Sequence, residues 1–405
     1  TCCAVFSKLG HTVHIIDINA EKISALGNGI VPFYEPGLEK LVKNGLTRKK
    51  LLPTLNYEKA VGAANTIFLC VGTPPKRNGD SNLSALFSAA QSIAPHIRRN
   101  TVLVIKSTVP VGTTEKIGAL IRTKTDVLFH LASCPEFLRE GSAIKDTLRP
   151  QRIVIGTTNA YARKTVMEIH RRLPGRRVLT DLRTAEMIKY ASNAFLATKI
   201  SFINEMANLC EETGANIDGV SLGMGLDPRI GTSFLNAGIG YGGSCFPKDT
   251  KALNCIALSY NYSFKLLKAV IEVNQLQRQR FMEKIKKALN PLKGKKIGVL
   301  GLAFKNNTDD VRESAALEIV QMLLRAEANV TAFDPRADAN AKKTLPKLKI
   351  AIEANEIFTR ADAVLVLYGD QPFIKAATIR KLHSLHENER PVITMAIVTA
   401  PHFEG

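Results

Sequence analysis

Gly10-His-Thr-Val-His-Ile-Ile-Asp17 contains a short β-branched apolar run that ends in an acid. A second stretch, Glu327-Ala-Asn-Val-Thr-Ala-Phe-Asp334, repeats the same order of helix end, strand and terminal acid. The repetition indicates two doubly wound α/β domains of the Rossmann type. Two unrelated α/β strands can also look this similar by chance.

The rest of the chain supports an α/β fold. Further buried strands are predicted over 66–71, 101–106 and 152–156, and helices over 20–26 and 84–93. Strands that alternate with helices predict a parallel sheet covered on both faces. Helical stretches follow, from about Thr184 to Gly214 and from about Asp249 to Leu289, and strands resume at 296–301, 329–334 and 363–368. We therefore expect a dinucleotide-binding domain over 1–183, a long central helical connector over 184–290, and a second Rossmann-like domain over 291–405.

The beginning of the chain lacks one expected feature. A dinucleotide domain normally opens with a strand and a GxGxxG turn whose amides hold the pyrophosphate. Residues 1–9 instead look like the body of the first helix, so we expect that the chain lacks its natural start, with the first strand and the GxG turn missing. Asp17 would then close the second strand and accept the adenosine ribose hydroxyls, which favours NAD over NADP.

Composition narrows the class of protein. The chain has 405 residues, 45% of them hydrophobic, and no apolar run reaches the roughly 18–20 residues of a membrane helix. The seven cysteines are scattered and form no CxxC pair, which fits a soluble protein of a reducing cytoplasm. The eight histidines show no metal-ligand spacing, so we expect no metal.

The formal net charge of +19 has three interpretations. Clustered Lys and Arg can bind nucleic acid, but the basic runs here are short and carry no interleaved aromatics. A positive surface can also attract anionic small molecules such as dinucleotides and nucleotide sugars. The third interpretation is a solvated basic surface without a specific partner. We expect no nucleic-acid partner, although the charge alone does not decide the matter.

The most informative segment is Gly238-Ile-Gly-Tyr-Gly-Gly-Ser-Cys-Phe-Pro-Lys-Asp249. Its four glycines allow positive φ and a close approach of backbone to ligand. Cys245 stands just before a predicted helix start, where the helix dipole and the free amides favour a thiolate. Lys248 and Asp249 lie within one turn and supply a cation and a proton acceptor. This setting favours a nucleophile over a small loop residue.

Two further clusters carry polar groups at helical spacing. In Thr184-Ala-Glu-Met-Ile-Lys189-Tyr-Ala-Ser-Asn193, Lys189 and Asn193 project from one helix face and could stabilise an alkoxide and hold a water. In Cys134-Pro-Glu136-Phe-Leu-Arg-Glu140-Gly, two carboxylates could serve as an acid/base and as a ligand to a ribose or amide. The alternative for the first cluster is that Lys189 is a surface lysine. The alternative for the second is a helix start with charged residues in its first turn.

Together these segments resemble the UDP-glucose 6-dehydrogenase family of nucleotide-sugar dehydrogenases. The matching pieces cover nearly the whole chain with even spacing. They are 10–17, Glu35-Pro-Gly-Leu38, Val71-Gly-Thr-Pro-Pro75, Ser107-Thr-Val-Pro110, Pro135-Glu-Phe-Leu138, 189–195, 199–205, 242–249, Gly301-Leu-Ala-Phe-Lys305 and Asp310-Val-Arg312-Glu-Ser314.

The resemblance implies a four-electron oxidation in which a sugar CH₂OH becomes a carboxylate and two NAD⁺ are reduced in turn. Cys245 would trap the intermediate aldehyde as a thiohemiacetal, which becomes a thioester and is hydrolysed. By the same resemblance Lys189 and Asn193 steady the oxyanions and Asp249 helps with proton transfer. Thr108 and Glu136 position water or act as acid/base.

The resemblance also implies binding residues and a partner. Those for NAD are Asp17, Lys22, Val71, Thr73, Thr108, Glu140, Lys248 and Arg312. Those for the UDP-sugar are Glu136, Lys189, Asn193, Asn236, Gly240, Tyr241, Gly242, Phe304 and Lys305. Arg229 resembles the arginine that one subunit of a family dimer lends to the neighbouring site, so a homodimer through the central helices is expected.

The sequence departs from the family pattern at several positions. Cys134 replaces Asn, Asn82 replaces Asp, Ala315 replaces Pro, and the segment Thr394-Met395-Ala396 lacks the usual Asp-x-Arg. Ser244 stands where the N-acetylhexosamine branch usually has histidine. We therefore rank UDP-glucose first as substrate, GDP-mannose second and UDP-N-acetylmannosamine third. A non-catalytic nucleotide-binding homologue is the alternative of a different class.

Overall fold

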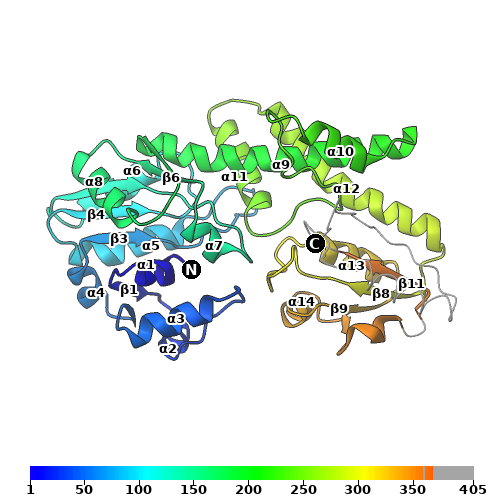
Figure 1. Cartoon of the computed structure of the whole chain (residues 1–405), viewed down its shortest axis with the longest axis horizontal. Helices are drawn as coiled ribbons and strands as arrows, with labels where there is room; N and C mark the ends of the chain where they lie inside the picture. The colour runs from blue at the N-terminus through cyan, green and yellow to red at the C-terminus, as the bar shows by residue number, and fades with distance from the viewer. Residues whose placement is uncertain (359–360, 368–405) are drawn as a thin grey trace. The chain divides into compact units, whose positions relative to one another are not determined.

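The computed structural model describes residues 1–358 and 361–367 and divides into two compact units (Figure 1). The first unit covers residues 1–192, and the second begins at residue 193. A single long helix, α9 (Leu182–Thr213), contains the boundary. Within the described ranges, no helix combines the length and the apolarity that crossing a membrane requires.

The first unit contains two sheets and their covering helices. A five-stranded sheet has the order β3-β4-β5-β6-β7, and a separate two-stranded sheet pairs β1 with β2 in parallel. The strands are β1 (Val13–Ile16), β2 (Leu51–Thr54), β3 (Thr66–Leu69), β4 (Thr101–Ile105), β5 (Phe129–Ser133), β6 (Arg152–Gly156) and β7 (Arg176–Thr180). The helices are α1 (Cys2–Lys8), α2 (Ala20–Gly27), α3 (Leu38–Thr47), α4 (Tyr57–Ala63), α5 (Ser84–Ile93), the short 3₁₀ helix η1 (Ala94–His96), α6 (Thr113–Arg122), α7 (Ala143–Leu148) and α8 (Ala160–Ile169).

Strand β4 shows why the larger sheet is buried on both faces. All five of its residues are buried. Leu103 and Ile105 pack into a core with α5 and α6, while Val102 and Val104 pack into a second core with α1 and α8. Because alternate residues of a strand point to opposite faces, one apolar run supplies both cores. The sheet is therefore covered on both sides, as the sequence predicted.

The prediction of a wholly parallel sheet was wrong. Strands β3, β4 and β5 run parallel, as do β6 and β7, but β5 meets β6 antiparallel at Ser133 and Gly156. A parallel connection needs a crossover of a dozen or more residues, usually a helix on a sheet face. Residues 134–151 contain only the six-residue α7, which packs against α1, so the chain enters β6 from the opposite end.

The second unit combines helices with a parallel sheet of order β10-β9-β8-β11. Its strands are β8 (Lys296–Leu300), β9 (Asn329–Phe333), β10 (Lys349–Ile350) and β11 (Ala363–Val366). Its other elements are α10 (Ile217–Gly225), α11 (Phe246–Ser259), α12 (Lys265–Leu289), α13 (Ala315–Arg325), α14 (Asp338–Thr344) and the 3₁₀ helix η2 (Ala354–Phe358). Its largest core joins the last turns of α12 to α13 and the sheet, through residues such as Ile285, Ile319 and Val299. The predicted fold class is confirmed: two α/β parts and a long central helix.

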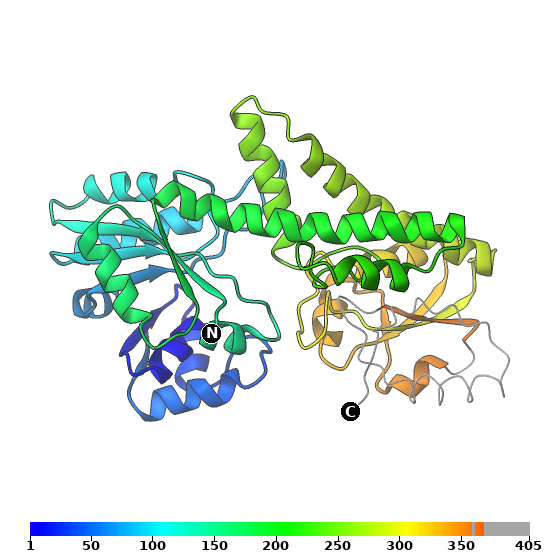
Figure 2. The same ribbon diagram turned by 45° about the horizontal axis from the view of Figure 1, so that its top comes forward.

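The predicted helical stretch from Asp249 to Leu289 is two helices. α11 ends at Ser259 and α12 begins at Lys265, and the chain bends sharply between them (Figure 2). Asn261 takes a φ of 56° in the bend. Asparagine is among the few residues that adopt this left-handed conformation readily.

Candidate active site

Cys245 occupies the N-cap of α11, and its side chain is exposed. Its carbonyl accepts the first helical hydrogen bond, from the Asp249 amide at 2.8 Å, and proline follows at the start of the helix. The free amides and the dipole of a helix N-terminus favour a thiolate at this position. The predicted helix start directly after Cys245 is confirmed.

The glycine loop before Cys245 approaches its neighbours too closely for side chains. A Cβ on Gly242 would lie 2.2 Å from the carbonyl oxygen of Glu313, and one on Gly243 would lie 2.4 Å from the Phe304 ring. The Gly243 amide donates to the Arg312 carbonyl over 3.0 Å, and its φ is 84°. The structure therefore brings Phe304 and Arg312, which the sequence assigned to substrate and cofactor, beside the cysteine loop.

Asp249 joins two other predicted site residues. Its side chain is 1% exposed. Asn193 Nδ2 donates to its Oδ2 over 2.6 Å, and the Lys248 ammonium forms an ion pair with its Oδ1. The carboxylate therefore ties the helix that carries Asn193 to the first turn of the helix that starts at Cys245.

Lys189 lies one turn before Asn193 on α9, as predicted, and is 4% exposed. Its Nζ lies 5.2 Å from the centroid of the Phe137 ring, and the guanidinium carbon of Arg152 lies 3.9 Å from the same ring. Phe137 directly follows Glu136, which is half-buried. Within the first unit, cation–π contacts thus join Lys189 and Arg152 to the ring that follows Glu136 in the chain.

Four of the residues assigned to NAD follow the ends of β1, β3 and β4: Asp17, Val71, Thr73 and Thr108. The other four do not, because Lys22 lies in α2, Glu140 lies in the loop before α7, and Lys248 and Arg312 belong to the second unit. Asp17 Oδ1 accepts the Asn19 amide over 2.9 Å, and Asn19 in turn caps α2 through the Lys22 amide. Among the described residues, no protein donor bonds the second Asp17 oxygen, which leaves it available to a ribose hydroxyl. Thr73 Oγ1 donates to the Thr108 carbonyl over 2.8 Å and joins the loops that follow β3 and β4. This donor set fits NAD.

Glu35 is a site-shaping residue whose role sequence reasoning missed. Its two oxygens accept the amides of Gly141 at 2.8 Å and Ala143 at 2.7 Å. The buried carboxylate therefore fixes the loop that carries Glu140. The motif Glu35-Pro-Gly was visible in the sequence, but nothing there indicated a partner more than 100 residues away.

Asp334, the counterpart of Asp17 in the second unit, has a different use. Its Oδ2 accepts the amides of Leu302 and Ala303, and its Oδ1 those of Arg336 and Ala337. This buried carboxylate shapes the loop that leads to Phe304 and Lys305. The repetition seen in the sequence is therefore one of topology: in the described residues both Asp334 oxygens accept backbone amides, whereas only one Asp17 oxygen does.

Arg229 and Asn236 lie in the loop between α10 and α11. The Arg229 side chain is 87% exposed and pairs with Asp227, two residues away. Asn236 is exposed as well.

Lys305 Nζ lies 5.4 Å from the centroid of the Phe304 ring. The segment 394–396 lies outside the residues that the structure describes.

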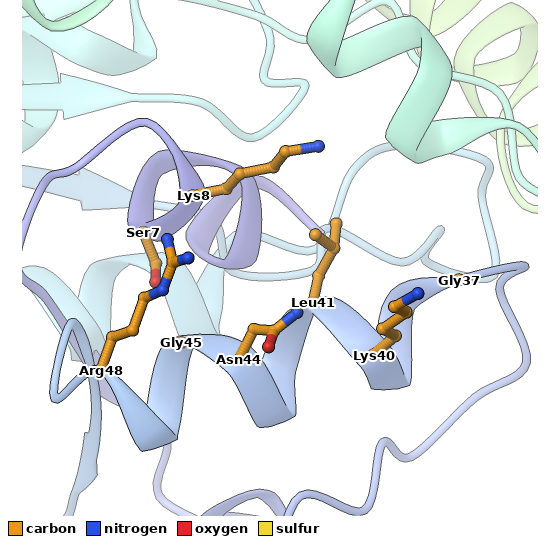
Figure 3. Close-up of a pocket in the computed structure, with 8 residues that line it drawn as sticks. All are labelled: Ser7, Lys8, Gly37, Lys40, Leu41, Asn44, Gly45 and Arg48. Atoms are coloured by element: carbon orange, nitrogen blue, oxygen red, sulfur yellow. The ribbon is translucent and has the colours of Figure 1, made fainter.

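A pocket of about 350 Å³ lies between α1 and α3 in the first unit (Figure 3). Its lining comprises Ser7, Lys8, Gly37, Lys40, Leu41, Asn44, Gly45 and Arg48, none of which the sequence assigned to the site. Lys8 and Arg48 stand at the C-terminal ends of α1 and α3, where cations complement the helix carbonyls. Helix ends explain two of its three cations, so we assign the pocket no part in the chemistry.

Comparison with known proteins covers most of the chain. Residues 1–174 match the NAD-binding domain of the UDP-glucose/GDP-mannose dehydrogenase family, 183–276 its central domain and 298–399 its UDP-binding domain. The UDP-glucose 6-dehydrogenase YwqF of Bacillus subtilis is 49% identical over 89% of this chain and 83% of its own. TuaD, a second UDP-glucose 6-dehydrogenase of that bacterium, is 44% identical over 96% of this chain and 84% of its own.

Solved structures of nucleotide-sugar dehydrogenases are similar to this chain over most of its length. A UDP-glucose dehydrogenase of Pyrobaculum islandicum superposes with a TM-score of 0.88 at 38% identity, covering 90% of this chain and 86% of that one. A UDP-D-ManNAc dehydrogenase of Pyrococcus horikoshii superposes with a TM-score of 0.82 at 28% identity, covering 94% and 89%. Sequence, fold and donor set lead to one assignment: this chain belongs to the UDP-glucose/GDP-mannose dehydrogenase family, and its cofactor is NAD.

Proposed function

We propose that the protein oxidises UDP-glucose to UDP-glucuronate through covalent intermediates on Cys245. The observation that carries the proposal is the exposed Cys245 thiol at the N-cap of α11, one turn from an Asp249 carboxylate that Asn193 and Lys248 hold. The relatives at 44–49% identity that bear the name UDP-glucose 6-dehydrogenase support the choice of reaction.

The proposed chemistry proceeds in three steps. The C6 alcohol first loses its hydroxyl proton and a hydride and becomes an aldehyde. The Cys245 thiolate then adds to the carbonyl carbon, and the thiohemiacetal loses its hydroxyl proton and a second hydride to become a thioester. Water cleaves the C–S bond and leaves the carboxylate and the free thiol. NAD⁺, when bound, supplies the hydride acceptor for both oxidations.

The polar residues assigned to the site suit the charges that develop in these steps. Each step passes through an oxyanion, which fixed hydrogen-bond donors stabilise. We assign that role to Lys189 and Asn193, and proton transfer to Asp249. Thr108 and Glu136 position the hydrolytic water or act as acid/base.

The binding residues are proposed on the same basis. NAD would contact Asp17, Lys22, Val71, Thr73, Thr108, Glu140, Lys248 and Arg312. The UDP-sugar would contact Glu136, Lys189, Asn193, Asn236, Gly240, Tyr241, Gly242, Phe304 and Lys305. The corresponding domains would be residues 1–183 for NAD, 184–290 for the connector and dimerisation, and 291–405 for the nucleotide sugar.

A homodimer through the central helices is part of the proposal. Phe195, Phe202 and Leu209 recur every seven residues on α9 and are 66%, 49% and 54% exposed. A stripe of large apolar side chains on one helix face indicates a protein interface. We propose that a second copy covers the stripe and that Arg229 reaches the partner's site. Light scattering should give the dimer mass, and Phe202→Glu should shift it towards the monomer.

The test of the activity is a product assay with NAD⁺ and a panel of UDP-glucose, GDP-mannose and UDP-N-acetylmannosamine. Two NADH per UDP-glucuronate, with UDP-glucose the best substrate by kcat/KM, would support the proposal. Preference for GDP-mannose or UDP-N-acetylmannosamine would keep the mechanism and change the substrate. No turnover of any of the three would favour a nucleotide-binding protein without catalysis.

A further inference from the structure

Helix α12 carries two polar residues in its buried face. Asn274 and Arg278 are both 5% exposed, stand one turn apart, and interrupt an otherwise apolar series that includes Val270 and Met282. Burying an amide or a guanidinium is costly unless its hydrogen bonds are made. The hydrogen bonds of Asn274 and Arg278 therefore show which part of the protein these two side chains position.

Asn274 bonds both backbone groups of Tyr241. Its Oδ1 accepts the Tyr241 amide over 2.7 Å, and its Nδ2 donates to the Tyr241 carbonyl over 3.1 Å. The approach is so close that a Cβ on Gly240 would lie 2.7 Å from Oδ1. The amide thus fixes the orientation of the peptide units of residue 241, four residues before Cys245.

Arg278 strengthens the same contact. One terminal nitrogen donates to the Tyr241 carbonyl over 2.7 Å, and the other lies 3.1 Å from Oε2 of Glu318 on α13. Its Nε has no partner among the described residues. A cation that is buried and incompletely paired is a poor source of stability, so the role that its hydrogen bonds indicate is to hold the loop at Tyr241.

The loop is pinned from its other side as well. Gly243 donates to the Arg312 carbonyl, and Gly242 has no room for a side chain against Glu313. Residues 241–243 therefore lie between α12 and the segment 312–313, and Cys245 follows two residues later as the N-cap of α11. A shift of the Tyr241 peptide would move the residue that starts the helix.

We propose that Asn274 and Arg278 are positioning residues that fix Cys245 for attack on the aldehyde. The inference rests on the proposed function, because it gives the two side chains a role in the capture step. Hydride loss from the alcohol does not involve the thiolate, whereas capture needs the sulfur at the carbonyl carbon. We call Asn274 and Arg278, with their hydrogen bonds to the Tyr241 backbone, the clamp. Loss of the clamp therefore affects the second oxidation more than the first.

The test compares Asn274→Leu, Asn274→Asp and Arg278→Met with the wild type. Asn274→Asp keeps the acceptor for the Tyr241 amide and removes one donor to its carbonyl, so it should retain more activity than Asn274→Leu. Arg280→Met is the matched control, because Arg280 is on the same helix but pairs with Glu211 and Glu212 at the surface. The measurements are kcat, KM for UDP-glucose, NADH per sugar consumed and trapped aldehyde.

We expect Asn274→Leu to lower kcat about 100-fold, which is the cost of misplacing a reacting group by about 1 Å. KM for UDP-glucose should rise as well, because Tyr241 is also assigned to the nucleotide sugar. NADH per sugar should fall below two and aldehyde should appear. A variant that stays folded, keeps two NADH per sugar and loses less than about twofold in kcat would overturn the proposal. If Asn274→Leu does not fold, Asn274→Asp is judged by its NADH ratio, since a purely structural role would lower thermal stability and leave that ratio at two.

A second measurement does not depend on the substrate. Alkylation of Cys245 by iodoacetamide, followed by mass spectrometry of its peptide, reports whether the sulfur keeps its place at the helix N-terminus. The clamp variants should react more slowly than the wild type and Arg280→Met. Equal rates in all five proteins would contradict the clamp, whereas wild-type protein that turns over no nucleotide sugar would contradict the proposed function alone.

Discussion

The side-chain amide of Asn193 donates a 2.6 Å hydrogen bond to Oδ2 of Asp249, and the ammonium of Lys248 pairs with Oδ1 of the same carboxylate. Asn193 lies on α9 and Asp249 in the first turn of α11. The bond therefore links two helices at the place where the nucleophile stands.

Asp249→Asn should test whether this carboxylate moves protons or only holds the helices together. The change keeps the shape and removes the charge that pairs with Lys248. We expect kcat to fall about 100-fold or more, as for loss of a general acid or base. Breaking the pair should also destabilise the protein by about 3 kcal/mol. Wild-type kcat in a destabilised variant would leave Asp249 a structural role only.

Cys245→Ser should stop the reaction after the first oxidation. A serine alkoxide forms far less readily than a thiolate, so the aldehyde is no longer captured efficiently. Mass spectrometry should show loss of the thioester, and the product should be aldehyde or an aldehyde-level adduct. Carboxylate formed at the wild-type rate would rule out the covalent route.

Gly243→Ala should damage both stability and catalysis. The backbone there has φ of 84°, and the new Cβ would lie 2.4 Å from the Phe304 ring. The strain should lower the free energy of unfolding by about 1–3 kcal/mol. We expect urea denaturation to show that loss together with a lower kcat. Gly238→Ala is the matched control in the same loop, because a Cβ there meets nothing within 4 Å.

The sequence was sufficient to place the main functional elements. The sequence predicted that Cys245 directly precedes a helix, and the four-residue spacing predicted that Lys189 and Asn193 share a helix face. These are local patterns, with fixed geometry. Strands such as β4 were equally clear, because an apolar run buried on both faces has no polar interruption.

The sequence was insufficient where partners are distant. Nothing local indicated that Glu35 binds the amides of Gly141 and Ala143, or that Asn274 binds the backbone of Tyr241. The antiparallel entry of β6 was missed for a similar reason, since strand direction depends on the path of the connection. A polar residue within an apolar helix face, as at Asn274 and Arg278, is the signal that could have revealed the clamp.

Asp17→Ala should weaken NAD⁺ binding selectively. One Asp17 oxygen bonds the Asn19 amide and the other is available to a ribose hydroxyl. Loss of hydrogen bonds to a charged group costs about 1.5–3 kcal/mol, so KM for NAD⁺ should rise about tenfold to 100-fold. The affinity for UDP-glucose, measured by calorimetry, should stay within about twofold of the wild type. Equal losses for both ligands would refute the ribose contact.

His170 should make stability depend on pH between about 6.5 and 4. Burial is the main reason that the pKa of this imidazole is lowered to about 4. The hydrogen bond to the Val166 carbonyl raises the pKa in part, and the nearby Lys106, Arg177 and His11 lower it further. Its ring also packs edge-on against Phe6. In that interval the unfolded chain binds the proton and the folded one does not, so falling pH favours unfolding. The full contribution is about 3 kcal/mol, present above pH 6.5 and lost as the pH falls towards 4. Urea titrations at several pH values should show this slope, and His170→Leu should flatten it. An unchanged slope in the leucine variant would assign the acid sensitivity to other groups.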